Sequence, residues 1–303
     1  MIRNWPVLES DSDTRIDAVL ASLSGLSRAT CAALIDEQRV TVNGKSVAKS
    51  HRVQFGDVVE VEFPDPDLTE SEPTVDLPVV FADDDLVVID KPAGVAAHPS
   101  AGWSGPTVIG SLTAMGHVLT SFGPVERKGI VHRLDVGTSG LMVVAKSERA
   151  YVSLKDQFRN RTVTKIYHTL IQGRLDQMSG TIDAPIDRHP NSSYRFAVLQ
   201  SGRPSITHYD TLDAFAYASL LEVHLETGRT HQIRVHMSAL RHPCCGDLTY
   251  GADPKLAARL GLTRQWLHAV LLAFEHPGTC QQVEFKSPYA DDLKQALDKV
   301  QDL

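Results

Sequence analysis

Residues 129–146 read GIVHRLDVGTSGLMVVAK, and the rest of the chain can be organised around this stretch. Leu141 to Val144 form a continuous apolar run of strand length, and Ile130 and Val131 are a shorter β-branched pair. Two buried strands are therefore expected on either side of a polar loop. Glycines let such a loop turn tightly and approach a ligand. Its candidate active-site side chains are His132, Arg133, Asp135, Thr138 and Ser139.

Asp135 has more than one interpretation from the residues alone. Asp and Gly are ordinary turn residues, so a surface turn would account for them. His132, Asp135 and Ser139 also suggest a serine hydrolase, but the members of such a triad normally come from separate elements. Residues 137–141 also lack the last glycine of a nucleophile elbow. The hydrolase is rejected, and a turn or an active-site carboxylate remains.

The same stretch resembles the signature of the RluA family of RNA pseudouridine synthases. In that family the aspartate of the HRLD run is catalytic, which implies that Asp135 is the catalytic residue here. KPAG at 91–94, followed by HP at 98–99, and ETGRTHQIRVHM at 226–237 continue the resemblance. It extends from about residue 13 to residue 292. An RNA isomerase that needs neither a cofactor nor a metal is implied.

The resemblance also implies roles for side chains outside the loop. Arg229 would pair with the catalytic carboxylate, and Tyr167 would stack on the uracil and accept the proton from carbon 5. Strand alternation over 162–171 places Lys165 on the same face as Tyr167, where a cation and a ring can contact a base. A surface lysine beside a core tyrosine would give the same pattern. Arg133 would fill the space that a flipped uridine leaves. The other substrate-binding candidates are His132, Ile233 and Leu267.

Patterns elsewhere predict the elements around these motifs. Helices are expected over 108–115, over 148–160 with Ser147 as the N-cap, and over 291–303. Strands are expected over 162–171 and 220–225. Residues 231–236 are also expected to be extended, with Ile233 and Val235 on one face and Gln232, Arg234 and His236 on the other.

Residues 13–63 have the pattern of a small separate domain. Apolar residues recur at helical spacing from Ile16 to Leu23, Gly25 should end that helix, and Ser27 should cap a second. Asn43-Gly44 predicts a hairpin. The run resembles the RNA-binding module first known from the fourth small-subunit ribosomal protein. That resemblance implies phosphate contacts from Arg15, Ser27, Arg28, Arg39 and Lys45, although solvated surface charges would have the same sequence.

Residues 64–77 are acidic, contain three prolines and lack periodicity, so a linker is predicted there. Residues 78–303 then form the catalytic domain. The family resemblance implies an α+β fold, in which a mixed, mostly antiparallel sheet with flanking helices surrounds a central cleft.

The net charge of −7 would argue against a nucleic-acid partner, but its distribution reverses that inference. Residues 64–85 contain eight acids and no Lys or Arg, whereas residues 126–174 contain ten bases and four acids. Affinity for phosphates depends on the local field, and the basic region surrounds the 129–146 stretch.

RNA is therefore the expected partner. The first substrate hypothesis is large-subunit ribosomal RNA, because the N-terminal module resembles that of the subgroup acting there. A transfer-RNA synthase and a non-catalytic RNA-binding or ribosome-assembly factor remain as alternatives. A cytoplasmic location without a membrane partner is expected, because no apolar run is long enough to span a bilayer and residues 1–13 lack a signal-peptide layout. A monomer is also expected.

Overall fold

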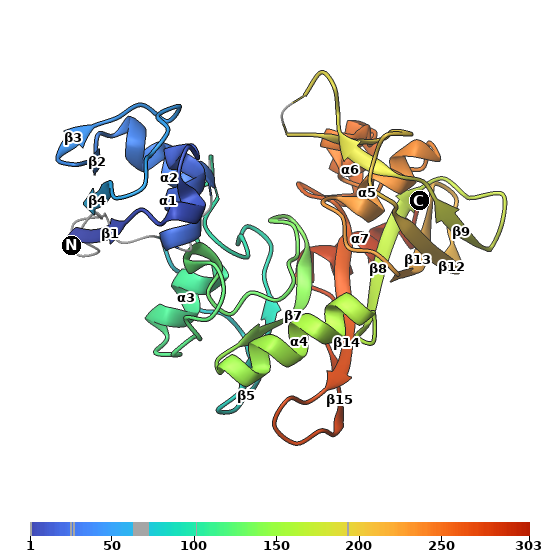
Figure 1. Ribbon diagram of the computed structural model, residues 1–303. Coiled ribbons are helices and arrows are strands. Elements are labelled where there is room, and N and C mark those ends of the chain that lie inside the picture. The colour runs from blue at the N-terminus through green and yellow to red at the C-terminus, as the bar shows by residue number, and fades with distance from the viewer. Residues whose placement is uncertain (1, 25, 27, 63–72, 101, 193) are drawn as a thin grey trace. The chain divides into compact units, whose positions relative to one another are not determined.

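The computed structural model describes residues 2–24, 26, 28–62, 73–100, 102–192 and 194–303 (Figure 1). The chain divides into two compact units. The N-terminal unit consists of Met1–Pro73 with Ser121–Lys128, and the larger unit consists of Thr74–Thr120 with Gly129–Leu303. Each unit has its own hydrophobic core. None of the described helices is long and apolar enough to cross a membrane.

The N-terminal unit packs two helices against a four-stranded antiparallel sheet in the order β1-β4-β2-β3. Asn43 and Gly44 both have positive φ, which is the requirement of a tight hairpin turn. The predicted pair of helices and the hairpin are thereby confirmed, whereas β1 was not predicted. The unit's elements are β1 (Ile2–Pro6), η1 (Glu9–Asp11), α1 (Ile16–Ser24), α2 (Arg28–Asp36), β2 (Val40–Val42), β3 (Lys45–Ser46), β4 (Val58–Glu62) and η2 (Val125–Arg127).

Two predicted features of this region cannot be compared with the structure. Gly25 and Ser27, expected at the end of one helix and the cap of the next, lie outside the described residues. Most of the expected linker lies there too, since the described chain resumes at residue 73.

The larger unit is built on a nine-stranded sheet in the order β5-β6-β7-β14-β8-β13-β12-β9, with β15 paired to β14. All of its strand pairs are antiparallel except β7 with β14. The mixed, mostly antiparallel α+β fold is therefore confirmed. The strands are β5 (Val79–Ala82), β6 (Leu86–Lys91), β7 (Ser139–Ala145), β8 (Thr164–Gln172), β9 (Ser179–Asp183), β12 (Ile206–Ala214), β13 (Ala218–Leu225), β14 (Leu267–Glu275) and β15 (Gln282–Lys286), with a separate pair β10 (Ile186–Arg188) and β11 (Phe196–Val198).

The parallel contact between β7 and β14 joins strands that are distant in sequence. It is registered at two positions, His268 opposite Ser139 and Ala269 opposite Gly140. A Cβ atom on Gly140 would lie 2.3 Å from the Ala269 carbonyl oxygen, and the φ of Gly140 is +112°. Glycine is therefore required at this position of the 129–146 stretch.

The larger unit also contains five α-helices, which are α3 to α7. Ser147 accepts a hydrogen bond from the Ala150 amide, which confirms the predicted cap of α4. Ala150 and Leu154 of α4 pack with Leu141 and Val143 of β7. The bounds are α3 (Val108–Ala114), α4 (Glu148–Asn160), α5 (Gln232–Ala239), η3 (Leu248–Tyr250), α6 (Pro254–Leu260) and α7 (Asp291–Gln301).

The expectation of an extended segment at 231–236 was wrong, because this run opens helix α5. Gln232 is buried, and its Oε1 accepts hydrogen bonds from the Arg229 amide at 3.0 Å and the Thr227 hydroxyl at 2.8 Å. Its Nε2 donates to the Ile206 carbonyl and the Thr207 hydroxyl. These bonds anchor the first turn of the helix to β12. The alternating faces expected for this run are therefore absent from α5.

The expected first strand at Ile130 and Val131 is reduced to one isolated bridge, between Ile130 and Val144. Gly129 lies so close to β7 that a Cβ there would be 2.3 Å from the Ala145 carbonyl oxygen. The chain therefore pairs with β7 at one position and then enters the loop that carries Asp135. The second expected strand is β7 itself.

Candidate active site

The loop that carries Asp135 is held by hydrogen bonds at residues 135–138. Within it, the Thr138 amide donates to the Asp135 carbonyl at 3.0 Å and closes a turn. On one side, the Gly94 amide donates to the Val136 carbonyl at 2.8 Å. On the other, Arg264 donates to the Gly137 carbonyl at 2.9 Å. Asp135 is thus carried by a fixed backbone.

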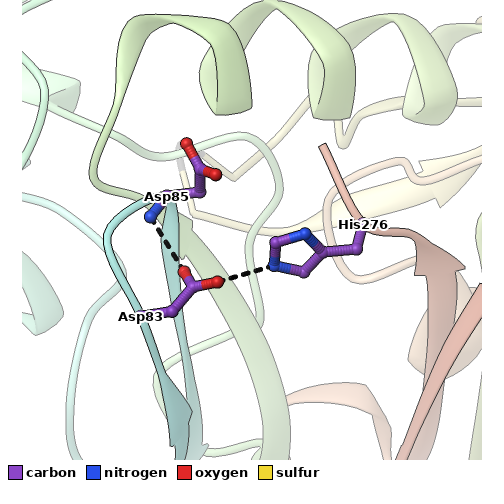
Figure 2. A group of neighbouring side chains, drawn as sticks. All are labelled: Asp83, Asp85 and His276. Carbon is purple, nitrogen blue, oxygen red and sulfur yellow. Dashed lines mark hydrogen bonds and ion pairs between the residues drawn. The ribbon is translucent and has the colours of Figure 1, made fainter. Parts of the chain in front are cut away.

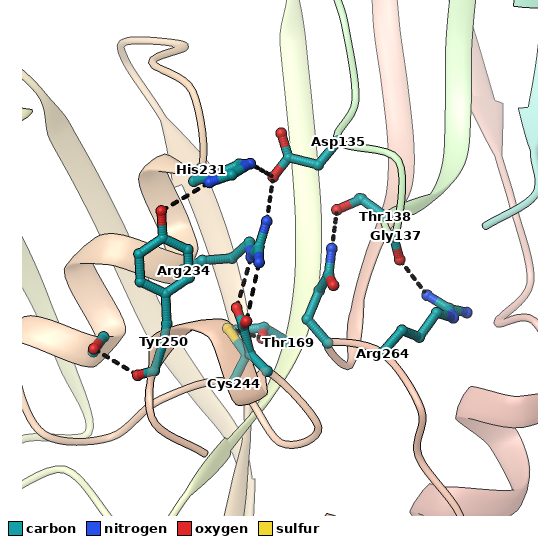
Figure 3. Close-up of polar contacts among 12 residues, drawn as sticks. Asp135, Gly137, Thr138, Thr169, His231, Arg234, Cys244, Tyr250 and Arg264 are labelled. Atoms are coloured by element: carbon teal, nitrogen blue, oxygen red, sulfur yellow. Dashed lines mark hydrogen bonds and ion pairs between the residues drawn. The ribbon is translucent and has the colours of Figure 1, made fainter. Parts of the chain in front are cut away.

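Arg234, in the first turn of α5, provides the cation that faces Asp135 (Figure 3). Its Nη1 lies 3.4 Å from Asp135 Oδ2, while Nε and Nη2 donate to Asp247 at 2.6 and 3.0 Å. Arg234 is 7% exposed and Asp247 2%. Burial works to lower the pKa of Arg234, but the hydrogen bonds and charge of Asp247 outweigh it, so that the pKa is raised. The guanidinium therefore remains charged beside Asp135.

Two aromatic side chains complete the surroundings of Asp135. The Tyr250 ring lies 4.9 Å from the Arg234 guanidinium carbon, within the range of a cation–π interaction. The Tyr250 hydroxyl lies 2.8 Å from Nδ1 of His231, and Nε2 of that imidazole is 3.9 Å from Asp135 Oδ2. Burial lowers the pKa of His231, although the charge of Asp135 opposes that shift. His231 and Arg234 thus approach the same carboxylate oxygen.

A small hollow opens beside Asp135, with a volume of about 70 Å³. Several water molecules fit a space of this size, since about 10–15 Å³ is enough for one. Its walls combine charged and apolar side chains from four elements and two loops. Of the candidate site residues named from the sequence, it brings together Arg133, Asp135, Thr138, Tyr167, Arg229, Ile233 and Leu267.

Arg229 lines this hollow, but it does not make the ion pair expected of it. Its Nε donates to the Pro204 carbonyl at 3.2 Å, whereas the cation beside Asp135 belongs to Arg234. Arg234 takes the place expected for Arg229 because residues 232–239 form helix α5. This helix directs the Arg234 side chain toward Asp135, whereas an extended run was expected. A catalytic role for Arg229 stays a prediction.

His132 and Lys165 lie apart from the residues that line the hollow. His132 Nε2 accepts from the Val143 amide at 3.0 Å, and its ring stacks on Phe158 with centroids 4.6 Å apart. Lys165 Nζ lies 5.7 Å from the centroid of the same phenyl ring. Burial, with a contribution from Lys165, lowers the pKa of His132 to about 3. Both side chains connect α4 to the sheet, and their role in substrate binding stays a prediction.

Tyr167 forms an apolar wall of the hollow from the middle of β8. Burial raises its pKa, and the negative charge of Asp135 raises it further. Ionisation of the phenol is therefore strongly disfavoured in the free protein. The ring can contact a base, but a role as proton acceptor receives no support from its environment.

Lys91 is a buried charge that sequence reasoning did not place at the site. The residue has 0% exposure, and its Nζ donates to the Pro92 and Val95 carbonyls, both at 2.9 Å, and to the Val136 carbonyl at 3.4 Å. Burial lowers its pKa to about 7, and the nearby Asp135 opposes that shift. Lys91 thus ties the KPAG turn to the loop at Val136. The KPAG motif was interpreted as a turn and as part of the family resemblance, but no role was given to its lysine.

A separate cluster of Asp83, Asp85 and His276 has oxygen and nitrogen atoms close enough to suggest a metal site (Figure 2). Its two carboxylates already contact protein groups. Both Asp85 oxygens accept from Arg149 at 2.6 Å, and Asp83 Oδ2 pairs with His276 Nε2 at 2.9 Å. Hydrogen bonds from Arg149, working against burial, lower the pKa of Asp85. We interpret the cluster as a structural link between the β5–β6 turn, α4 and the segment after β14.

In the N-terminal unit, the described residues that were singled out for phosphate contact are at least partly exposed. Arg15 and Arg28 both pair with the buried Asp17, at 3.0 Å each. Arg39 pairs with Glu37 at 3.1 Å, and Lys45 is exposed on β3. Ser27 lies outside the described residues. Phosphate binding by this set stays a prediction.

Comparison with known proteins matches both units. Residues 85–239 match the family model described as RNA pseudouridylate synthase, and residues 14–59 match the S4 domain model. An RNA pseudouridine synthase of Mycobacterium tuberculosis is 57% identical over 298 residues, with 97% of both chains covered. Ribosomal large subunit pseudouridine synthase D of Nitrosomonas europaea is 40% identical, with 95% of this chain and 85% of that one covered. The solved structure of human RNA pseudouridylate synthase domain containing 1 has a TM-score of 0.59 and 29% identity, and the match covers 73% of this chain and 87% of that one.

Proposed function

The chain belongs to the RNA pseudouridylate synthases, which are isomerases, and from that membership we propose that it acts on specific uridines of large-subunit ribosomal RNA with Asp135 as the catalytic carboxylate. The observation that carries this proposal is the asymmetric environment of the carboxylate. Oδ2 faces Arg234 and His231, whereas Oδ1 has no hydrogen-bond or ion-pair partner among the described residues. One oxygen is thus available to a substrate in the hollow.

The reaction needs groups that this site contains. Pseudouridine formation breaks the bond from N1 of uracil to C1′ of the ribose, rotates the base and joins its C5 to C1′. C5 then loses its proton and N1 gains one, so that the product is an isomer of the substrate. Asp135 would act on the ribose, by attack at C1′ or by removing a proton from C2′. The guanidinium of Arg234 stabilises the carboxylate and the charge that develops beside it. No oxidant, reductant or external nucleophile enters this scheme.

The walls of the hollow fit a base that has left its stack. Tyr167, Ile233 and Leu267 offer apolar surface, and aromatic rings contact unstacked bases favourably. Extruding a uridine costs a few kcal/mol, least where it is already unpaired. Arg133 lines the same hollow and would occupy the vacated position in the RNA.

The ribosomal substrate is supported by the S4 domain match and by relatives named for the large ribosomal subunit. A cytoplasmic, monomeric protein that meets ribosomal RNA during assembly fits this substrate. Transfer RNA is the alternative substrate.

The experiment is mass-spectrometric mapping of pseudouridine in ribosomal and transfer RNA from cells that carry the wild-type protein or Asp135→Asn. Loss of modification at particular large-subunit uridines in the variant is the expected result. Asp156→Asn is the matched control, because Asp156 is exposed on α4 and pairs with Arg159 on the same helix. If only transfer-RNA sites change, the proposal of a ribosomal RNA substrate is wrong. If no site changes while the wild-type protein binds RNA, the enzyme hypothesis is wrong and the protein is a non-catalytic RNA-binding factor.

A further inference from the structure

His231 lies immediately before α5 with left-handed backbone angles, φ 58° and ψ 21°. Positive φ is uncommon outside glycine, although histidine, like asparagine and aspartate, adopts it more readily than other residues do. Here two rings contact the imidazole edge-on, Phe196 at 5.7 Å and Tyr250 at 5.6 Å between centroids. The backbone and the ring of His231 are therefore both fixed, with Nε2 directed at Asp135.

The hydrogen bonds of Tyr250 favour one of the two neutral forms of the His231 imidazole. The Tyr250 oxygen accepts from the Phe196 amide at 3.0 Å, which leaves the phenol hydrogen to be donated. Nδ1 of His231, at 2.8 Å, is its acceptor among the described residues. A neutral imidazole that accepts at Nδ1 carries its hydrogen on Nε2. That hydrogen points to Asp135 Oδ2, whose distance from Nε2 is 3.9 Å.

We propose that His231 is a positioning residue, which uses its Nε2–H to hold Asp135 Oδ2 and so presents Oδ1 to the ribose. This inference rests on the proposed role of Asp135. The gap of 3.9 Å is longer than a hydrogen bond. Catalytic hydrogen bonds are often long in the free enzyme and shorten when substrate binds. Arg234 holds the same oxygen with its charge, and His231 adds a second, neutral donor from a different direction.

The neutral form of His231 fits its charged surroundings. Burial has the largest effect and disfavours the protonated imidazole of His231. Asp135 and Asp247 favour protonation, whereas Arg234 and Arg133 oppose it. The pKa of His231 is therefore lowered, so that the ring is neutral at pH 7. Tyr250 faces the ring as a neutral phenol, because burial raises its pKa as well.

The first test compares two substitutions. In His231→Gln the amide nitrogen can reach the position of Nε2, whereas in His231→Asn it can reach only that of Nδ1. Asparagine tolerates left-handed angles better than glutamine. A purely structural role therefore predicts that Asn is the milder change, and the positioning role predicts the opposite order.

For the positioning role we expect His231→Gln to retain kcat within about fivefold and His231→Asn to lose about 10–100-fold, with KM unchanged in both, because a misplaced catalytic group costs about this much. His236→Gln and His236→Asn are the matched controls. His236 is buried in the same helix, but its nitrogens bond Thr207 and Ala184. The control pair should change stability without reproducing the kcat order.

The second test needs no turnover. The ¹⁵N spectrum of histidine-labelled free protein should show His231 with its hydrogen on Nε2, and the signal is assigned by its absence in His231→Gln. A hydrogen on Nδ1 overturns the proposal, as does an Asn variant equal to or better than Gln in kcat. If Asp135→Asn keeps wild-type activity, the proposed function has failed. If that variant is inactive while both His231 variants match the wild type, only this inference has failed.

Discussion

Asp247 binds Arg234 through two guanidinium nitrogens and leaves Nη1 as the one turned toward Asp135. The buried pair therefore sets the direction from which a positive charge meets the carboxylate. Asp247 and Asp135 lie in segments that neither adjoin in sequence nor share a strand. The motif that carries Asp135 thus depends on a carboxylate that the motif does not contain.

Asp247→Ala should strongly destabilise the protein. It leaves the guanidinium of Arg234 buried without its principal partner, and breaking a buried pair in this way costs about 3–5 kcal/mol. Urea denaturation measures the loss in free energy of unfolding. Asp156→Ala breaks an exposed pair with Arg159 and should cost less than about 1 kcal/mol. Equal costs for the two variants would contradict a structural role for the Asp247 pair.

Tyr167→Phe should retain activity within about tenfold, because general acid–base help by a side chain contributes about 10²–10⁴-fold and this phenol is held neutral. Tyr167→Ala should lose far more, since it removes a wall of the hollow. Single-turnover assays on a ribosomal RNA fragment separate the two outcomes. A loss above about 100-fold in the Phe variant would restore the role of proton acceptor.

Lys91→Met should change how stability depends on pH. The pKa of Lys91 is about 7 in the folded chain against 10.5 for the ordinary side chain. Between these values the unfolded chain binds a proton that the folded chain has released, so the contribution of Lys91 to stability rises with pH. The wild type should gain up to about 1.4 kcal/mol per pH unit relative to the variant. Denaturation from pH 6 to about pH 10 measures this difference, and parallel curves would show that Lys91 is not desolvated.

Lys45→Ala should weaken binding to ribosomal RNA and reduce the slope of log affinity against log salt by about 0.7–0.9, as expected for one lost phosphate contact. Filter binding of the full chain at several salt concentrations measures that slope. Lys49→Ala is the matched control, because Lys49 lies in the same unit but pairs with Asp36 at 2.8 Å. A slope unchanged by Lys45→Ala, or changed equally by both, would remove Lys45 from the RNA contacts.

Local chemistry made several elements predictable from the sequence. The apolar run at 141–144 can be satisfied only by burial, and it lies in β7. Ser147 has a side chain that caps a helix, and Asn43-Gly44 accepts the positive φ of a tight turn. These residues determine their conformation with little help from distant parts of the chain.

The site itself depended on contacts that local patterns do not encode. Six residues of QIRVHM suit a strand or a helix, and the outcome is decided by bonds from Gln232 to Ile206 and Thr207, about 25 positions away. Because that helix was not predicted, neither was the inward direction of Arg234. Lys91 was missed for a related reason, since its side chain bonds both the turn at 92–95 and the loop at Val136, which is 45 positions away.

The parallel contact between β7 and β14, which pairs two residues of each strand, affects the order in which the site is completed during translation. Asp135 leaves the ribosome about 100 residues before Arg234, and the partners of Gly140 in this contact follow later still. A nascent chain that ends before α5 carries the HRLD loop without its cation, and its β7 edge is not yet covered by β14. The N-terminal strands and helices need far less of the chain and can fold earlier. A growing polypeptide should therefore be able to bind RNA well before it can isomerise a uridine.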